Sequence, residues 1–286
     1  MAPRASRPRA VLGIDAAWTA RQPSGVALVV EQGARWRCAG LAPSYDAFLA
    51  LADGRGVDWD GPPPRGSLPD AAALLAAAAR LAPGAEVAVI AADLPLAHTP
   101  IVRRRAADDA VSRAFGARGC GVHSPSSERP GPLADRLREA LAALGYPLAT
   151  APGPAQRAVL EVYPHTALLA LLGLDYRLPY KLSRARRYWP EETPVARRGL
   201  LLVAWDRVLR ALQAELDGIA LPLPTGRDEA QAAARLKRFE DALDALLCAW
   251  VGVAYLAGQA EPYGDADAAI WCPLPAPRRG SGAPPP

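Results

Sequence analysis

The chain has 286 residues, of which 51% are hydrophobic and 22% are charged, and its formal net charge is +4. This composition excludes wholesale disorder, because it provides enough apolar side chains for a core of useful size. The positive excess lies near the two ends, in Arg4, Arg7, Arg9, Arg278 and Arg279; without them, 28 basic residues face 29 acidic ones. Bulk charge alone therefore does not indicate a nucleic-acid-binding protein.

Cysteine spacing and hydropathy argue against further classes of protein. The four cysteines are far apart in the sequence: Cys38, Cys120, Cys248 and Cys272. They form no C-x-x-C pair, which argues against a zinc ribbon or a dithiol redox site. The first apolar stretch ends at Asp15, so we expect no secretory signal, and the longest uncharged run, 245–260, is too short for a confident membrane span. A cytoplasmic protein without membrane association is predicted.

The first elements are strands. Residues 1–9 are rich in proline and arginine, and we predict a flexible leader there. Three short apolar stretches with β-forming residues follow at 10–17, 25–31 and 34–41, and turn residues separate them. Because the connections are short, these strands are predicted to form an antiparallel meander.

The rest of the chain alternates between helical and strand patterns. Periodicity predicts helices at 45–52, 70–81, 106–114, 133–144, 166–172, 194–216 and 228–256. Uniformly apolar runs at 86–92 and 158–162 predict strands covered on both faces, and 270–274 fits a short final strand. Residues 275–286 are rich in proline, arginine and glycine, and we predict a disordered tail.

These elements predict a single α/β domain over residues 10–274, with helical insertions. Three antiparallel strands come first, and right-handed crossovers would place the two later strands parallel to the first. The expected sheet is therefore mixed and five-stranded, with helices flanking it. In such sheets, ligands bind beyond the carboxyl ends of the parallel strands, so the acidic residues found there are candidates for a site.

Five acidic residues occupy unusual positions. Asp15, Asp93 and Glu161 lie in or directly after apolar strands, and Asp241 and Asp244 lie three residues apart on one face of the last long helix. A carboxylate buried in an apolar strand is costly unless something neutralises it. One or two divalent cations would do so, since hard cations prefer oxygen ligands. Two cations about 3.5–4 Å apart would also activate water and stabilise the leaving oxygen in phosphodiester cleavage.

Each acid has a simpler alternative explanation. Asp93 precedes Leu-Pro and would also fit a helix cap or an ion pair. Glu161 would also fit an ion pair with an arginine such as Arg157. Asp241 would also fit a solvated position, as we expect for its neighbour Glu240. Asp15 and Asp244 are the hardest to explain in this way, because apolar residues surround them in the sequence.

Several motifs, taken together and in order, resemble one family. They are Gly13-Ile14-Asp15-Ala16-Ala17-Trp18, Ser24-Gly25-Val26-Ala27, Ala92-Asp93-Leu94-Pro95-Leu96, Glu161-Val162-Tyr163-Pro164-His165, Tyr180-Lys181, Asp241-Ala242-Leu243-Asp244-Ala245 and Ile270-Trp271-Cys272-Pro273. The set covers residues 10–274 and resembles domain-of-unknown-function family 429, a group of predicted nucleases in the RNase H-like superfamily. The resemblance implies an RNase H-like fold and a nuclease that hydrolyses phosphodiester bonds in nucleic acid, without distinguishing DNA from RNA.

The resemblance also implies a metal site. It places Mg²⁺ or Mn²⁺ on Asp15, Asp93 and Asp244, with Asp15 bridging two ions. Glu161 or Asp241 would be a further ligand, which makes these five residues the implied catalytic set. The helix that carries the last two aspartates is similar to the last catalytic helix of Holliday-junction resolvases. Superfamily nucleases often carry a glutamate at the position of Asp93 or on the helix after the third strand. The helices between 45 and 81 offer no such residue, so the fourth ligand stays open.

Basic residues and histidines near these acids are candidates for binding substrate. Arg103, Arg105 and Asp109 belong to a segment that follows the fourth strand and is expected to overhang the site. Arginine matches the geometry of phosphate, although a solvated helix start with internal Arg–Asp pairs fits the same pattern. His123, His165 and Lys181 complete the set: Lys181 matches the family motif, whereas a lone histidine such as His123 or His165 more often has a structural role.

Two rival functions fit part of the pattern. The first is an ATP-dependent phosphotransferase or ATPase of the actin and sugar-kinase type, because Asp15, Thr19, Ser24 and Gly25 resemble the first phosphate loop of that superfamily. Such proteins usually repeat the fold, and this sequence has no second glycine-rich phosphate motif. The second rival is a non-catalytic nucleic-acid-binding protein of the same fold. The complete acidic set argues mildly against it.

Overall fold

The computed structural model describes residues 7–153, 157–224 and 233–275. Residues 1–6 of the predicted leader, 276–286 of the predicted tail and 228–232 of the predicted last helix lie outside this range. Arg9, expected to end the leader, is instead the first residue of strand β1 and forms an ion pair with Glu31.

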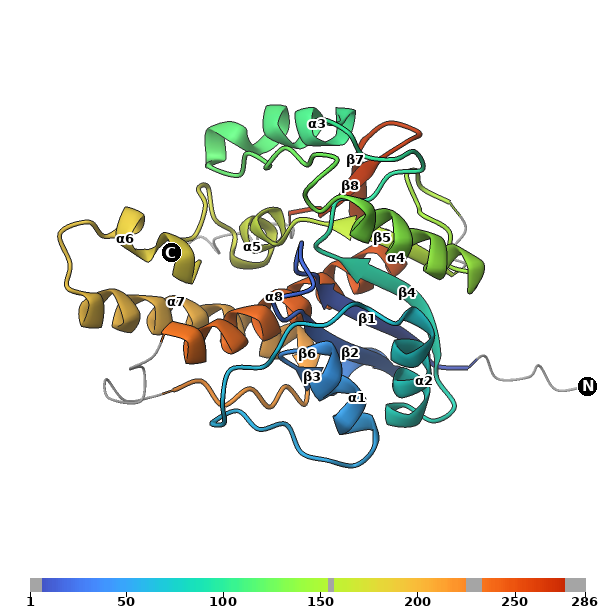
Figure 1. The fold of residues 1–286 in the computed structure, drawn as a ribbon, viewed down its shortest axis with the longest axis horizontal. Helices are drawn as coiled ribbons and strands as arrows, with labels where there is room; N and C mark the ends of the chain where they lie inside the picture. Colours follow the sequence, from blue (N-terminus) through green and yellow to red (C-terminus); the bar gives the residue numbers. More distant parts are fainter. Residues whose placement is uncertain (1–6, 154–156, 225–232, 276–286) are drawn as a thin grey trace, which may run out of the picture.

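Within the described residues, eight strands form one mixed sheet in the order β6-β3-β2-β1-β4-β5-β8-β7 (Figure 1). They are β1 (Arg9–Asp15), β2 (Gly25–Gln32), β3 (Arg35–Ala42), β4 (Glu86–Ala92), β5 (Ala158–Val162), β6 (Leu216–Asp217), β7 (Ala260–Gly264) and β8 (Ala269–Pro273). Strand β2 is antiparallel to β1 and β3, whereas β1, β4, β5 and β8 run parallel to one another. The carboxyl ends of these four strands therefore meet at one edge of the sheet.

The predicted five-stranded sheet is wrong, because three further strands extend it at both sides. Strand β6 pairs with β3 through two residues only, and a strand of this length carries no sequence period. At the other side, β8 adds in parallel to β5, and β7 pairs antiparallel with β8. Strand β7 is short, incompletely buried and contains Pro262, which are properties of edge strands that sequence patterns do not distinguish from loops.

Helices cover both faces of the sheet (Figure 1). One layer contains α1 (Tyr45–Ala52), α2 (Ala71–Leu81) and α4 (Pro132–Ala143), and the other contains α5 (Pro164–Leu172), α7 (Pro194–Glu215) and α8 (Ala233–Leu256). Val11 packs toward the second layer and Leu12 toward the first, which explains the unbroken apolar sequence of β1. Two further helices are α3 (Ala106–Phe115), which packs against β7 and β8, and α6 (Ala185–Tyr188), which packs against α7. None of the described helices is long and apolar enough to cross a lipid bilayer.

Two glycines allow the backbone of α8 to touch the sheet. A Cβ atom at Gly13 would lie 2.2 Å from the carbonyl oxygen of Ala245, and one at Gly25 would lie 2.0 Å from that of Asp241. Gly25 also pairs with Asp15 across β1 and β2. No side chain larger than hydrogen fits at either contact, so these glycines set the depth at which α8 presents its acidic residues to the end of β1.

Candidate active site

Asp15 and Asp93 lie at the carboxyl ends of two neighbouring parallel strands. Asp15 is the last residue of β1, and Asp93 directly follows β4. The backbone N–H of Asp93 donates to the carbonyl oxygen of Ile14 over 2.8 Å, which places the two aspartates on adjacent strand ends. Both residues are half-buried and line a hollow at the carboxyl edge of the sheet.

Helix α8 brings three further carboxylates to the same edge. Glu240, Asp241 and Asp244 are only 2%, 1% and 0% exposed. The expectation that Glu240 is solvated is therefore wrong: its carboxylate accepts the backbone N–H of Leu182 over 2.5 Å. The close contact of α8 with β1 and β2 buries this turn of the helix.

Two lysines neutralise part of this negative charge. Lys181 forms an ion pair with Asp244, which also accepts the hydroxyl of Tyr180 over 2.8 Å. Lys237 forms ion pairs with Asp241 and, over 3.0 Å, with Glu240. Sequence reasoning identified Lys181 but missed Lys237, although its spacing of three and four residues from these acids puts all of them on one helix face.

The carboxylates repel one another in a largely dry environment. Burial raises the pKa of Asp93 and of Asp241 well above the usual range, and the carboxylate of Asp15 adds to both shifts. Burial, partly offset by Lys181, raises the pKa of Asp244 to about 6, and Asp15 again contributes. Asp15 thus interacts with aspartates from β4 and from α8, which makes it the electrostatic centre of the cluster.

The lysines remain charged despite their surroundings. Burial works against the charge of Lys181, but Asp244 and Glu240 outweigh it and hold its pKa well above the usual range. For Lys237, Glu240 and Asp241 likewise outweigh burial and raise the pKa. The two ammonium groups in turn outweigh burial at Glu240 and lower its pKa. Glu240 is therefore ionised and serves to hold both lysines in place.

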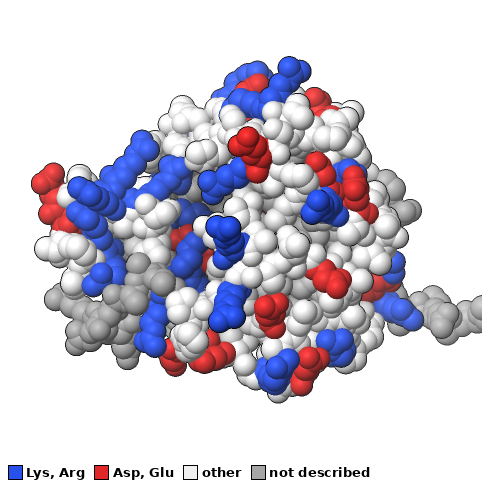
Figure 2. All heavy atoms as spheres, in the orientation of Figure 1, with Lys and Arg blue, Asp and Glu red and all other residues white. Residues whose placement is uncertain are grey.

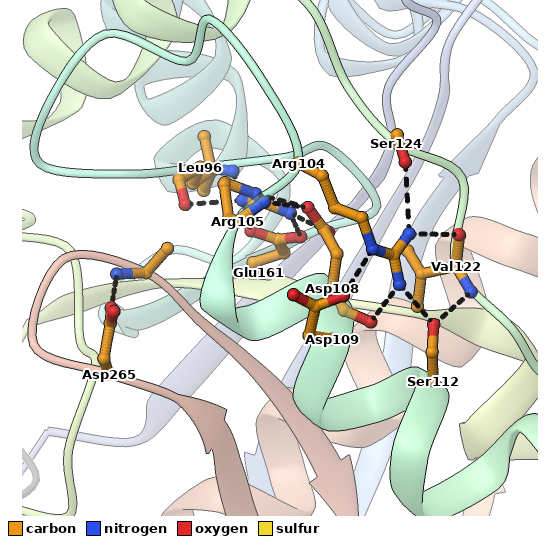
Figure 3. Close-up of polar contacts among 11 residues, drawn as sticks. Leu96, Arg104, Arg105, Asp108, Asp109, Ser112, Val122, Ser124, Glu161 and Asp265 are labelled. Atoms are coloured by element: carbon orange, nitrogen blue, oxygen red, sulfur yellow. Dashed lines mark hydrogen bonds and ion pairs between the residues drawn. The ribbon is translucent and has the colours of Figure 1, made fainter.

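Glu161 lines the smaller hollow together with Asp93 and adds to the raised pKa of that residue, but an arginine engages both of its carboxylate oxygens (Figure 3). Arg105 donates to both of its carboxylate oxygens, over 2.6 and 2.7 Å, and the backbone N–H of Leu96 donates to it over 2.7 Å. Arg105 also pairs with Asp108 over 2.7 Å. Glu161 thus has an arginine partner, but Arg157, the one considered from the sequence, pairs with Glu86 instead. Arg105, Asp108 and Glu161 thus form a buried triad that stabilises the fold.

The other residues of the arginine-rich segment also lie away from the acids. Arg103 is exposed and lines a separate hollow near β7. Asp109 is exposed and pairs with Arg104, whose guanidinium also reaches Ser112 and Ser124 (Figure 3). The alternative of a helix start with internal Arg–Asp pairs therefore describes this segment, and the structure does not bring Arg103, Arg105 or Asp109 to the acidic cluster.

Two adjoining hollows lie over the acids. One, of about 430 Å³, is lined by Asp15, Asp93 and Arg129 among others, and the other, of about 340 Å³, by Lys181, Lys237 and Glu240 among others. Trp18, Asp93 and His123 line both, so the hollows form one continuous depression. Figure 2 shows the recess on this face, with lysine and arginine side chains along its rim.

The two candidate histidines differ in their surroundings. His123 is exposed and lines both hollows. His165 is 5% exposed and lines only the smaller hollow, where its ring packs edge-on against Tyr163 and Tyr180 at centroid distances of 5.2 Å. The structure therefore brings both histidines and Lys181 to the depression that contains the acids.

Comparison with known proteins gives one match. The family model described as "Protein of unknown function (DUF429)" covers residues 13–268, which is most of the chain. The chain belongs to the DUF429 family. No curated protein and no solved structure matches it. The family resemblance identified from the motifs is confirmed, and the description of the family assigns no activity.

The carboxylates of this DUF429 protein suit a divalent cation, but Lys181 and Lys237 form ion pairs with two of them, Asp244 and Asp241. Asp15, Asp93, Asp241 and Asp244 offer the carboxylate oxygens that Mg²⁺ and Mn²⁺ prefer. The Oδ2 atom of Asp241 is buried and has no hydrogen-bond partner in the described structure. Over residues 7–153, 157–224 and 233–275, no group of three or more ligating side chains is already arranged around a metal position. A cation would therefore require these side chains to move toward one another.

The repulsion among the acids predicts an unusual pH dependence. Asp93→Asn is expected to stabilise the protein in a chelator at neutral pH by about 0.5–2 kcal/mol, because it removes a charge that the fold holds at a cost. The raised pKa of Asp93 means that the folded state holds its proton more tightly than the unfolded state. The free energy of unfolding of the wild type therefore falls as pH rises from about 4, where Asp93 begins to lose its proton in the unfolded state. The asparagine of the variant has no proton to lose, so the stability advantage of Asp93→Asn grows over the same pH range.

Urea unfolding of both proteins between acidic and neutral pH measures this difference. Asp206→Asn is the matched control, because the Asp206 side chain is 50% exposed on α7 and its ion-pair partner among the described residues is Arg210 of the same helix. Its effect is expected to stay within about 0.5 kcal/mol at all pH values. A lower stability of Asp93→Asn than of the wild type at neutral pH would contradict the interpretation of the cluster as strained.

Proposed function

We propose that this protein is a divalent-metal-dependent nuclease that hydrolyses phosphodiester bonds in nucleic acid. The observation that carries the proposal is the meeting of Asp15, Asp93, Asp241 and Asp244 from β1, β4 and α8 at the carboxyl edge of the sheet, where Asp15 and Asp93 line the larger hollow and the other two are buried behind them. Burial raises the pKa values of Asp93, Asp241 and Asp244, and repulsion from the carboxylate of Asp15, which a cation would relieve, adds to each shift. This pattern is typical of sites that hold Mg²⁺ or Mn²⁺.

Each residue has a role in the proposal. Asp15 and Asp93 face the larger hollow and would hold the cation from the sheet side, with Asp241 and Asp244 from the helix side. When bound, Mg²⁺ or Mn²⁺ supplies Lewis-acid stabilisation of the charge that develops on the phosphate oxygens. Lys181 and Lys237 lie at the border of the smaller hollow, where a displaced ammonium group would attract the phosphate backbone. Glu161 is left out of the ligand set because Arg105 occupies both of its oxygens.

The experiment that tests the proposal is cleavage of a panel of labelled nucleic acids. Single-stranded DNA, duplex DNA, RNA, an RNA–DNA hybrid and a four-way junction would each be incubated with Mg²⁺, with Mn²⁺ and with a chelator. We expect cleavage of at least one substrate that the chelator abolishes, and the preferred substrate then defines the subclass. Absence of cleavage of every substrate with both metals would refute the proposal.

The ATP-handling alternative finds less support in the geometry. The Ser24 hydroxyl is buried and accepts the backbone N–H of Ala17 over 3.0 Å, and Gly25 lies against the backbone of α8. These two residues of the supposed phosphate loop thus have roles in the fold. Calorimetric titration with ATP and Mg²⁺ separates the alternatives, since binding of ATP would favour the phosphotransferase. Binding of nucleic acid without any divalent cation uptake would favour the non-catalytic protein.

A further inference from the structure

The smaller hollow has features that the acidic cluster does not require. Its volume of about 340 Å³ lies within the range of small-molecule sites, which starts at about 300 Å³. It extends from the acids toward α5 and the segment that ends at Arg184. The smaller hollow therefore extends the depression away from the acidic cluster. A polymeric substrate bound at the cluster would continue into it.

Part of the lining of this hollow is apolar and aromatic. Trp18, Tyr163, His165 and Ile270 line it. Burial, together with the neighbouring Arg177 and Lys181, lowers the pKa of His165 well below the usual range, so its imidazole is neutral. Its Nδ1 atom is buried and has no hydrogen-bond partner in the described structure. A neutral ring with a free nitrogen complements the polar edge of an uncharged planar group better than it complements a phosphate.

The lining of the hollow also carries positive charge, close to these aromatic rings, that is still free to bind an anion. Arg177 and Arg184 both line the hollow, and within the described residues neither pairs with a carboxylate. The Nε atom of Arg177 is buried without a partner, and its guanidinium makes only a long contact of 3.4 Å with the carbonyl oxygen of Gly119. Arginines with unused donors beside an apolar wall are suited to a ligand that joins a phosphate to an aromatic ring.

We propose that the smaller hollow receives one unpaired nucleotide of the substrate, with its base against Trp18 and Tyr163 and its phosphate toward Arg177 and Arg184. This inference rests on the proposed nuclease function and specifies its substrate class: a single strand, or a strand with an unpaired nucleotide at the cut. In a duplex, the bases are stacked and paired, so entry of a base requires flipping, which costs the free energy of unpairing and unstacking it. A single strand enters without that cost.

Binding, measured without cleavage, tests the proposal. The wild-type protein in a chelator would be titrated with a short labelled single-stranded DNA oligonucleotide and with its duplex, and fluorescence anisotropy would report affinity. We expect the single strand to bind on the order of tenfold more tightly, and Trp18→Leu and Arg184→Ala each to lose on the order of tenfold. Arg80→Ala is the matched control on α2, across the sheet, and is expected to bind like the wild type.

A second titration separates base recognition from phosphate recognition. In calorimetry, a nucleoside 5′-monophosphate is expected to bind and ribose 5-phosphate to bind at least about tenfold more weakly, because stacking on an aromatic side chain contributes this much. Equal affinity for the two ligands, equal affinity for single strand and duplex, or wild-type affinity in both variants would each overturn the proposal. The Arg184→Ala variant keeps the test valid if Trp18→Leu does not fold.

These outcomes are distinct from those of the cleavage panel. If the protein binds unpaired nucleotides but cleaves no substrate, the proposed nuclease activity is refuted and the proposed nucleotide site is supported. If it cleaves duplex and single strand equally and binds no nucleotide in the hollow, the nuclease activity is supported and the nucleotide site is refuted.

Discussion

Asp15→Asn is expected to reduce metal-dependent cleavage by roughly a thousandfold, which corresponds to about 4 kcal/mol of transition-state stabilisation. The amide keeps the size of the side chain but removes the charge that acts on Asp93, Asp241 and Asp244. Because Asp15 is the acid that interacts with all three, its loss weakens cation binding more than the loss of any one of the others. Single-turnover cleavage of the preferred substrate at saturating Mg²⁺ measures the effect.

The structure also predicts that this variant folds. Removing a like charge from the cluster relieves repulsion, so in a chelator Asp15→Asn is expected to unfold at no lower a temperature than the wild type. Asp206→Asn serves again as the control, with activity within about twofold of the wild type, because this half-exposed residue on α7 lines neither hollow. If Asp15→Asn retained more than about a tenth of the activity, the cluster would not be the catalytic centre.

Arg105→Met is expected to lower the free energy of unfolding by roughly 3–5 kcal/mol, because it leaves buried carboxylates without their counter-ion. Glu161 is 4% exposed and Asp108 is 0% exposed, and Arg105 is the ion-pair partner of both. Methionine replaces the apolar stem but none of the donors. Urea unfolding at neutral pH measures the loss, and the loss is expected to shrink at acidic pH, where the orphaned carboxylates take up protons.

A matched pair shows whether burial is the cause. Arg35 and Asp217 form an equally well-aligned pair, with two contacts of 2.8 Å, but their side chains are 52% and 48% exposed. Arg35→Met is therefore expected to shift the urea midpoint far less than Arg105→Met does, because solvent screens an exposed pair. Adding Glu161→Gln to Arg105→Met should recover part of the stability, because it removes one orphaned charge. Equal losses for Arg35→Met and Arg105→Met would show that the triad is not buried in solution as it is in this structure.

Local sequence determined most of the elements and part of the site. The uniformly apolar runs at 86–92 and 158–162 correspond to the central strands β4 and β5, because a strand covered on both faces needs apolar residues throughout. The cost of burying Asp15 and Asp244 in such surroundings identified both acids before any contact was known. The i, i+3 spacing placed Asp241 and Asp244 on one face of α8 for the same reason of local geometry.

Only the tertiary structure decided which groups meet. Glu161 and Arg105 are 56 residues apart, and Lys181 and Asp244 are 63 apart, so no local period connects either pair. Of the three consecutive arginines 103–105, only Arg105 lies at the start of α3 beside the end of β5. There it pairs with Glu161, so its role is to stabilise the fold and not to bind substrate. The edge strands β6 and β7 depend likewise on neighbours distant in the sequence. Propensity and period act over a few residues, whereas ion pairing and strand addition depend on how the whole chain packs.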